Sequence, residues 1–211
     1  MNLQDALSSG IQALGLDLPA DTPERLDAFA RLLIKWNKVY NLTAIRDEGQ
    51  VLTHHLLDSL SALPALAGIK RLVDVGSGGG LPGVVLAIAR PDLQVDSVET
   101  VQKKASFQNQ ARIELKLPNF RAHHARIENW QPAYAPEAPD GIISRAFADL
   151  ADFVALTAHL AGPDTRILAM KGIYPADEIA RIPAGFALEQ SIELAVPGLD
   201  AERHLLIVKR T

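Results

Sequence analysis

Short apolar runs that alternate with stretches of helical length fill the chain from Lys70 onward, and this pattern constrains the fold more than any other feature. Such alternation is typical of βα units in a mostly parallel sheet. Only residues 195–203, which include Pro197 and Gly198, separate the last two runs, so an antiparallel hairpin is expected at the sheet edge. The sequence therefore predicts an α/β fold, Rossmann-like and doubly wound, with about seven strands near residues 71–75, 94–98, 120–124, 141–144, 166–170, 187–194 and 204–209.

The chain before Lys70 has helical periodicity instead. Its apolar residues fall on one face of a segment near residues 3–14 and of another near residues 26–40, and a third helix is expected over residues 50–62. We therefore expect two parts: an N-terminal helical extension over residues 1–69 and an α/β domain over residues 70–211.

Composition excludes several classes of protein. With 211 residues and 48% apolar side chains, the chain can bury one sizeable core and a small helical appendage. The absence of cysteine rules out disulfides, thiolate metal sites and cysteine nucleophiles. No stretch approaches the roughly 18 apolar residues of a membrane span, and Met1 to Gly10 does not read as a signal peptide. A cytoplasmic protein that does not contact membranes is the simplest expectation.

The net charge of −4 argues against binding nucleic acid through an overall positive field, so local patches would have to carry any such role. One candidate is the segment from Glu24 to Arg46, where bases outnumber acids. Ordinary solvated helix charges explain that pattern as well.

A glycine-rich turn follows the first expected strand, in the sequence Asp74-Val75-Gly76-Ser77-Gly78-Gly79-Gly80-Leu81-Pro82-Gly83. Glycines there permit positive φ angles and let backbone amides approach a ligand closely. The turn departs from the dinucleotide fingerprint because Leu81 occupies the position where a third Gly or Ala is expected. Tight turns also use glycine for structural reasons alone, so the turn by itself is weak evidence for a nucleotide-binding site.

Glu99 strengthens the case for a nucleotide site. It ends the second expected strand, where a carboxylate can accept hydrogen bonds from both ribose hydroxyls of an adenosine. Its alternative role is that of an acid favoured near a helix N-terminus. The chain shows no Tyr-x-x-x-Lys pair and no cysteine for hydride transfer, whereas transfer of an activated sulfonium methyl needs mainly positioning. The pattern favours S-adenosylmethionine, with a nicotinamide oxidoreductase as the alternative.

The sequence also resembles a known family over nearly its whole length, the bacterial small-subunit rRNA guanine-N7 methyltransferases first described as glucose-inhibited division protein B. Several ordered motifs carry the resemblance: residues 36–45 (WNKVYNLTAI), 54–60 (HHLLDSL), 74–83 (DVGSGGGLPG), 144–146 (SRA) and 170–172 (MKG). The stretch from Gln131 to Pro139 departs from the family as a slightly expanded loop.

The resemblance implies a class I methyltransferase fold and methylation of N7 of one guanine in the 530 loop of 16S rRNA, with S-adenosylmethionine as the cofactor. Lys103 and Lys104 follow Glu99 as the family's lysines do. The expected substrate is 16S rRNA within a partly or fully assembled small ribosomal subunit, bound by a monomer without a metal. A methyltransferase acting on a small molecule or a protein is the remaining alternative. The residues expected to bind the cofactor are Gly76, Ser77, Gly78, Leu81, Glu99, Ile127, Glu128 and Arg145, and those expected to bind the substrate are Arg145 and Lys171.

The chemistry of this reaction makes few demands on side chains. Guanine N7 carries a free lone pair at neutral pH, so we expect no catalytic proton acceptor. The base must be unpaired or extruded, because the major groove of A-form RNA is too narrow for a protein. Trp36, Tyr40 and Phe147 are candidate stacking partners, although core packing is the commoner role of such rings. His54 and Asp58 have helical metal-ligand spacing, but an ordinary hydrogen bond between them is the favoured interpretation.

Overall fold

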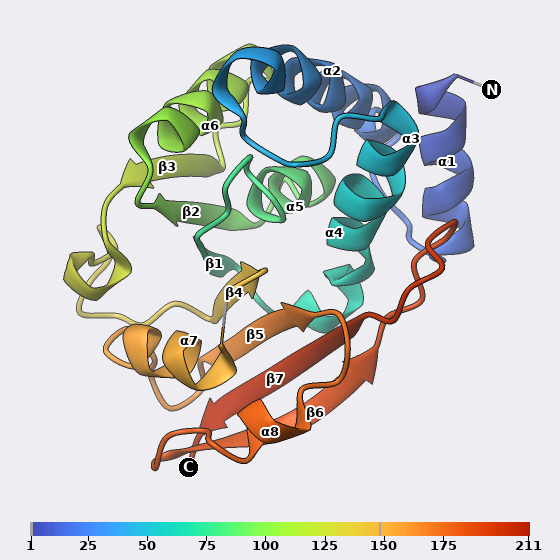
Figure 1. Cartoon of the computed structure of the whole chain (residues 1–211). Coiled ribbons are helices and arrows are strands. Elements are labelled where there is room, and N and C mark those ends of the chain that lie inside the picture. The colour runs from blue at the N-terminus through green and yellow to red at the C-terminus, as the bar shows by residue number, and fades with distance from the viewer. Residues whose placement is uncertain (1, 148) are drawn as a thin grey trace.

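A computed structural model describes residues 2–147 and 149–211, and it contains the expected seven-stranded sheet (Figure 1). The strand order is β3-β2-β1-β4-β5-β7-β6. Strands β1 to β5 pair in parallel, while β7 runs antiparallel to both β5 and β6. The predicted edge hairpin is confirmed. The strand bounds are β1 Arg71–Val75, β2 Gln94–Glu99, β3 Phe120–His124, β4 Gly141–Arg145, β5 Arg166–Lys171, β6 Phe186–Glu193 and β7 His204–Arg210.

Burial along the strands explains why the sequence showed continuous apolar runs in the centre of the sheet. The strands β1, β4 and β5 are buried along almost their whole length, because helices cover both faces of the sheet. The sheet has a hydrophobic core on each face, and successive strand residues point to opposite faces. Leu72 therefore packs in the larger core and Val73 in the smaller one. Only β6, at the edge, is largely exposed.

Helices on the two faces complete a three-layer arrangement. The helices α5 (Gly83–Ala89) and α6 (Gln102–Glu114) belong to the larger core, and α7 (Leu150–Thr157) to the smaller one. Two short elements, the 3₁₀-helix η3 (Ile127–Asn129) and α8 (Ala176–Ile179), lie in the connections after β3 and β5.

The N-terminal helices share the larger core with the sheet. The helices α1 (Leu3–Ala13) and α2 (Thr22–Tyr40) contribute buried side chains such as Leu7 and Leu33 to the cluster that also holds Leu72. Helix α2 contacts both α5 and α6, and Figure 1 shows it lying across them. No helix in the described ranges is long and apolar enough to cross a membrane.

The expected third helix is interrupted by a π-helical segment. Helix α3 (Glu48–Val51) leads into the π-helix η1 (Leu52–Leu57), followed by α4 (Asp58–Ser61) and the 3₁₀-helix η2 (Leu63–Leu66). In a π-helix each backbone hydrogen bond spans five residues instead of four, and such segments are frequent at functional sites. The wider turn carries His54 and His55.

Candidate active site

The glycine-rich turn joins the end of β1 to α5 and has the backbone conformation that its glycines predict. Gly76, Gly78 and Gly80 have φ values of 71°, 56° and 81°, a region that residues with a β-carbon seldom adopt. Ser77 is buried and its hydroxyl contacts that of Ser97 on β2. Leu81 is buried at the start of the following helix.

Asp74 lies fully buried in β1, directly beneath the turn. Its Oδ2 accepts a hydrogen bond from the Gly83 backbone N–H at 2.8 Å. A β-carbon on Gly83 would lie 2.4 Å from that oxygen, so only glycine fits there. The other carboxylate oxygen, Oδ1, has no hydrogen-bond partner among the described residues. Burial raises the pKa of Asp74 to about 7.

Glu99, at the end of β2, holds the opposite side of the turn. Its Oε2 accepts from the Gly78 N–H at 2.8 Å and its Oε1 from the Val101 N–H at 2.9 Å. Gln108 on α6 adds a second support, because its Nε2 donates to the Gly78 carbonyl at 2.9 Å. Gln108 also accepts from the Ser97 hydroxyl at 2.6 Å. Neither Ser97 nor Gln108 belongs to a recognisable motif; each is only a polar residue in a buried strand or helix.

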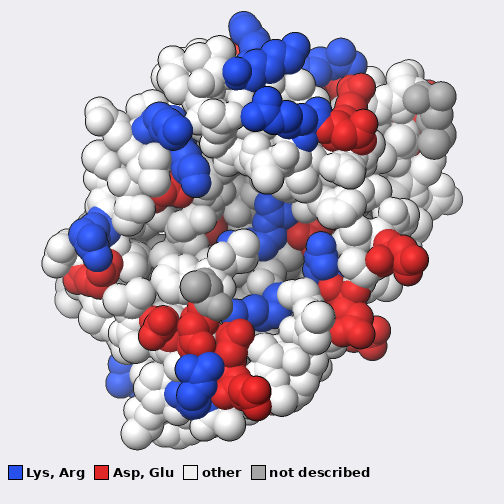
Figure 2. Space-filling model, viewed as in Figure 1, with Lys and Arg blue, Asp and Glu red and all other residues white. Residues whose placement is uncertain are grey.

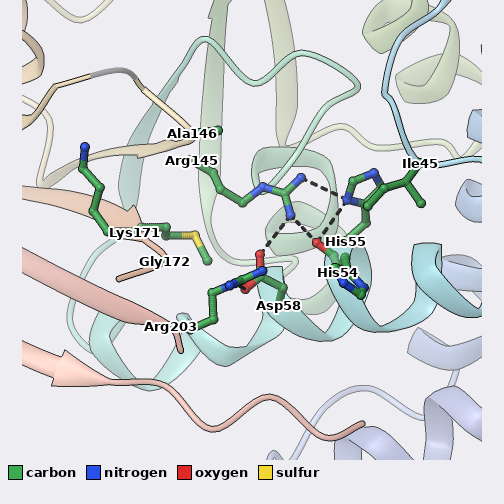
Figure 3. A pocket seen from close by; sticks show the side chains of 10 residues that line it. Ile45, His54, His55, Asp58, Arg145, Ala146, Lys171, Gly172 and Arg203 are labelled. Carbon is green, nitrogen blue, oxygen red and sulfur yellow. Dashed lines mark hydrogen bonds and ion pairs between the residues drawn. The ribbon is translucent and has the colours of Figure 1, made fainter. Parts of the chain in front are cut away.

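A pocket of about 350 Å³ opens beside the turn (Figure 3). Ala146, at the end of β4, has a φ of 60°, which is uncommon for a residue with a side chain. The next residue, Phe147, brings the pocket and the turn together: a β-carbon on Gly76 would lie 4.0 Å from its ring. The pocket is lined by Ile45, His54, His55, Asp58, Arg145, Ala146, Met170, Lys171, Gly172 and Arg203.

Arg145 is at the centre of the pocket's polar wall. Its Nη1 donates to the His54 carbonyl at 2.7 Å and to Oδ2 of Asp58 at 3.0 Å. Asp58 is also held by Arg203, whose Nε lies 3.1 Å from Oδ1. Figure 3 shows both guanidinium groups directed at this one carboxylate. Arg145 is therefore held in an ion pair with Asp58, and this ion pair lies in the pocket wall.

His55 connects the Arg145 cluster to the loop after α2. Its Nε2 lies 2.8 Å from the Thr43 hydroxyl, and its Nδ1 lies 3.3 Å from Nη2 of Arg145. Burial, together with the charge of Arg145, lowers the pKa of His55 to about 4, so the ring is neutral at pH 7. The loop is fixed in turn by Asn37, which accepts from the Thr43 N–H at 2.9 Å and donates to the Ile45 carbonyl at 3.0 Å.

Lys171, at the end of β5, lines the pocket but directs its ammonium away from the Arg145 cluster, as Figure 3 shows. Its Nζ lies 2.7 Å from Oε2 of Glu178 and 3.2 Å from the Phe147 carbonyl. Lys171 was expected to bind the substrate, and its contact with Glu178 was not foreseen. Sequence reasoning also missed Arg203, which stands just before the last strand with no motif around it.

Two further expected residues follow β3. Ile127 is buried in the smaller core, and the Glu128 carboxylate lies 3.1 Å from a nitrogen of Arg126. Neither lines the pocket beside Arg145.

The prediction of a hydrogen bond between His54 and Asp58 is wrong. The His54 ring contacts the Thr53 hydroxyl at 2.8 Å, and the Asp58 carboxylate binds Arg145 and Arg203 instead. Within the described ranges, no group of three His, Cys, Asp or Glu side chains is placed to hold a metal ion.

The candidate stacking rings pack against other aromatic side chains. Trp36 lies between Tyr40 and Phe107, with ring centroids at 5.1 and 5.6 Å, and Phe147 packs on Phe153 at 5.3 Å. Tyr40 is 40% exposed.

Two solved methyltransferases share this architecture. The O-methyltransferase TomG from Streptomyces achromogenes, solved with its cofactor, has a TM-score of 0.60 at 15% identity, covering 100% of each chain. The mitomycin 7-O-methyltransferase MmcR has a TM-score of 0.63 at 15% identity, covering 98% of this chain and 67% of that one. The fold is therefore that of the class I methyltransferases, as expected.

Sequence comparison identifies the family within that class. The family model described as rRNA small subunit methyltransferase G matches residues 22–206. A ribosomal RNA small subunit methyltransferase G from Azoarcus sp. (strain BH72) is 60% identical over 97% of this chain and 95% of its own length. Another from Aromatoleum aromaticum is 61% identical over 97% of each. The chain belongs to the rRNA small subunit methyltransferase G family. Membership of this family excludes the alternative that the protein is a nicotinamide-dependent oxidoreductase.

Proposed function

We propose that this protein transfers the methyl group of S-adenosylmethionine to N7 of a single guanine in the 530 loop of 16S rRNA. The observation that carries this proposal is the family match, which extends over residues 22–206 and includes both the turn and the pocket. The geometry agrees with it, since β1, which leads into the turn, pairs in parallel with β4, and the carboxyl end of β4 lines the pocket.

The turn has the features that an adenosyl cofactor needs. Gly76 and Gly78 leave room for a close ligand, and Glu99 ends β2 beside them, where its carboxylate can bind ribose hydroxyls. The free oxygen of Asp74 adds a buried acceptor beneath the turn. We assign cofactor binding to Gly76, Ser77, Gly78, Leu81, Glu99, Ile127, Glu128 and Arg145. When bound, S-adenosylmethionine supplies a methyl group already activated by its sulfonium.

The side chains around the pocket act by holding and orienting the base. Guanine N7 needs no deprotonation. His55 is a weak base, because its pKa is lowered to about 4 and its ring nitrogens contact Thr43 and Arg145, and Asp58 is held by two arginines. Arg145 and Lys171 are the proposed substrate contacts, because a guanidinium and an ammonium suit phosphate or carbonyl oxygens. Positioning of N7 in line with the methyl group then accounts for most of the acceleration.

The N-terminal segment 1–69 contributes to this reaction as well as to the core. It supplies His54, His55 and Asp58 to the pocket, while the segment 70–211 supplies the turn and Arg145. We propose these two segments as the two parts of a monomer. A substrate within a partly or fully assembled small subunit places the reaction in the cytoplasm.

Methyl incorporation tests the proposal directly. Naked 16S rRNA, 30S subunits and assembly intermediates would be incubated with labelled cofactor and the modified nucleotide mapped. Label at N7 of one guanine in the 530 loop is the expected result. Tight cofactor binding without labelling of any rRNA would exclude the proposed substrate.

A further inference from the structure

The exposed face of α2 carries a row of cations. Arg31, Lys35 and Lys38 stand at helical spacings of four and three residues, so they share one face, and all three are exposed. Figure 2 shows Lys and Arg side chains gathered over α2 at the top of the molecule. In a chain with a net charge of −4, this local concentration of positive charge is notable.

Two of the three charges are not neutralised by an ion pair. Arg31 binds Asp27 at 2.9 Å, but neither Lys35 nor Lys38 has a carboxylate within 4.0 Å in the described ranges. The Glu48 carboxylate also acts on Arg31 and, with Asp27, raises the pKa of its guanidinium, so the acids near the row act on Arg31. The row therefore keeps a net positive charge.

The opposite face of α2 packs directly on the glycine-rich turn. A β-carbon on Gly79 would lie 3.0 Å from Cδ1 of Leu33, and Trp36 packs on Phe107 of α6. The cations thus stand on the outer side of the helix that covers the turn.

The chain leaving α2 leads straight to the pocket, whose lining includes Ile45. The seven residues from Lys38 to Ile45 span at most about 25 Å. An RNA strand whose base enters the pocket therefore has backbone phosphates within reach of α2.

We infer that the exposed face of α2, formed by Arg31, Lys35 and Lys38, binds the phosphate backbone of the RNA that flanks the target guanine. The inference rests on the proposed function and adds a surface to it. Phosphate contacts of this kind fix the register and orientation of a nucleic acid without reading its sequence. They would explain how an acidic protein holds RNA: the positive charge is concentrated on the helix beside the site.

The test compares Lys35→Gln/Lys38→Gln with a matched control, Lys70→Gln/Lys116→Gln. The control removes the same charge from two exposed lysines at the opposite edge of the sheet, where β1 begins and α6 has ended. RNA affinity would be measured from 50 to 200 mM salt, on naked 16S rRNA and on 30S subunits, with cofactor affinity as a check of folding.

Each phosphate contact contributes about 0.7 to 0.9 to the slope of log affinity against log salt. Removal of both lysines is therefore expected to lower that slope by roughly 1.5 and to raise KM for RNA, with cofactor affinity and kcat at saturating RNA unchanged. The control should match the wild type. Affinity and slope equal to wild type on the methylated substrate would overturn the inference.

A loss confined to 30S subunits, with naked rRNA bound as by the wild type, would also overturn it, since a protein contact would then be responsible. If the wild-type protein labels no rRNA at all, the proposed function fails instead, and the two failures are distinguishable.

Discussion

Oδ2 of Asp58 accepts a hydrogen bond from Nη1 of Arg145 at 3.0 Å, and this contact joins the N-terminal helices to the carboxyl end of β4. The Asp58 side chain is only 4% exposed, and its other oxygen binds Arg203. One buried carboxylate therefore sets the positions of two guanidinium groups in the pocket wall.

Replacement of Asp58 should harm both stability and turnover. Asp58→Ala leaves two arginines without their shared partner, which typically costs about 3–5 kcal/mol for a buried pair. Asp58→Asn retains one acceptor and should destabilise less, while misplacing Arg145 and lowering kcat/KM about tenfold or more. Urea unfolding and methylation assays measure the two effects. An Asp58→Asn protein with wild-type kcat/KM would show that the orientation of Arg145 is unimportant.

Glu99→Gln should weaken cofactor binding. The substitution keeps one oxygen for the Gly78 N–H but removes the charge proposed to bind the ribose hydroxyls. A hydrogen bond to a charged group contributes about 1.5–3 kcal/mol, so affinity should fall at least about tenfold. Calorimetry would measure the affinity for S-adenosylmethionine, with Glu189→Gln on the exposed edge strand as the control. Equal affinity in all three proteins would remove Glu99 from the cofactor site.

Lys171→Gln should raise KM for RNA several-fold and leave cofactor affinity unchanged. The partner variant Glu178→Gln separates two explanations, because it frees the ammonium from its 2.7 Å contact and keeps the positive charge. If Lys171 contacts RNA, Glu178→Gln should bind RNA at least as tightly as the wild type. If Lys171 serves only to hold Glu178, both variants should lose stability and neither should change RNA affinity.

Asp74 should make the stability of the protein depend on pH near neutrality. Its pKa is about 7 when folded, against an ordinary value of 3.8, so between these pH values the folded state binds more protons than the unfolded one. The free energy of unfolding should therefore fall as pH rises through this window, by up to about 1.4 kcal/mol per pH unit from this group. The contribution of Asp74 to the free energy of unfolding is complete below the pKa of the unfolded state and is lost above pH 7.

Asp74→Asn carries a neutral group of the same shape at every pH. Its free energy of unfolding, measured between pH 5 and 7, should decline less steeply than that of the wild type. Parallel curves would show that Asp74 ionises normally in the folded protein.

The sequence predicted most of the sheet because its strands are short, buried and bounded by helices. The edge hairpin was predictable too, since the linker containing Pro197 and Gly198 is too short for a crossover. The third helix was only partly predictable. The π-helix carries the His54 carbonyl and the His55 ring that contact Arg145, and such tertiary contacts are invisible in local periodicity.

The candidate site, like the fold, was only partly predictable from the sequence. Glu99 was found because its place at a strand end follows from chain order. Arg203 and Glu178 were not, because each meets its partner only through tertiary folding: Arg203 reaches Asp58 from the far end of the chain. The role of Asp58 was misjudged for that reason, since its helical neighbour His54 was the only partner that sequence spacing could suggest.

The 2.4 Å separation between Oδ2 of Asp74 and a β-carbon placed on Gly83 makes these two positions a coupled pair. A side chain at 83 is admissible only if the residue at 74 becomes smaller, and that change would remove the acceptor that anchors the start of α5. Position 83 therefore cannot change alone during evolution, because any residue other than glycine requires a smaller residue at position 74 first. Position 74 has no such dependence on a change at 83, so the constraint runs in one direction only.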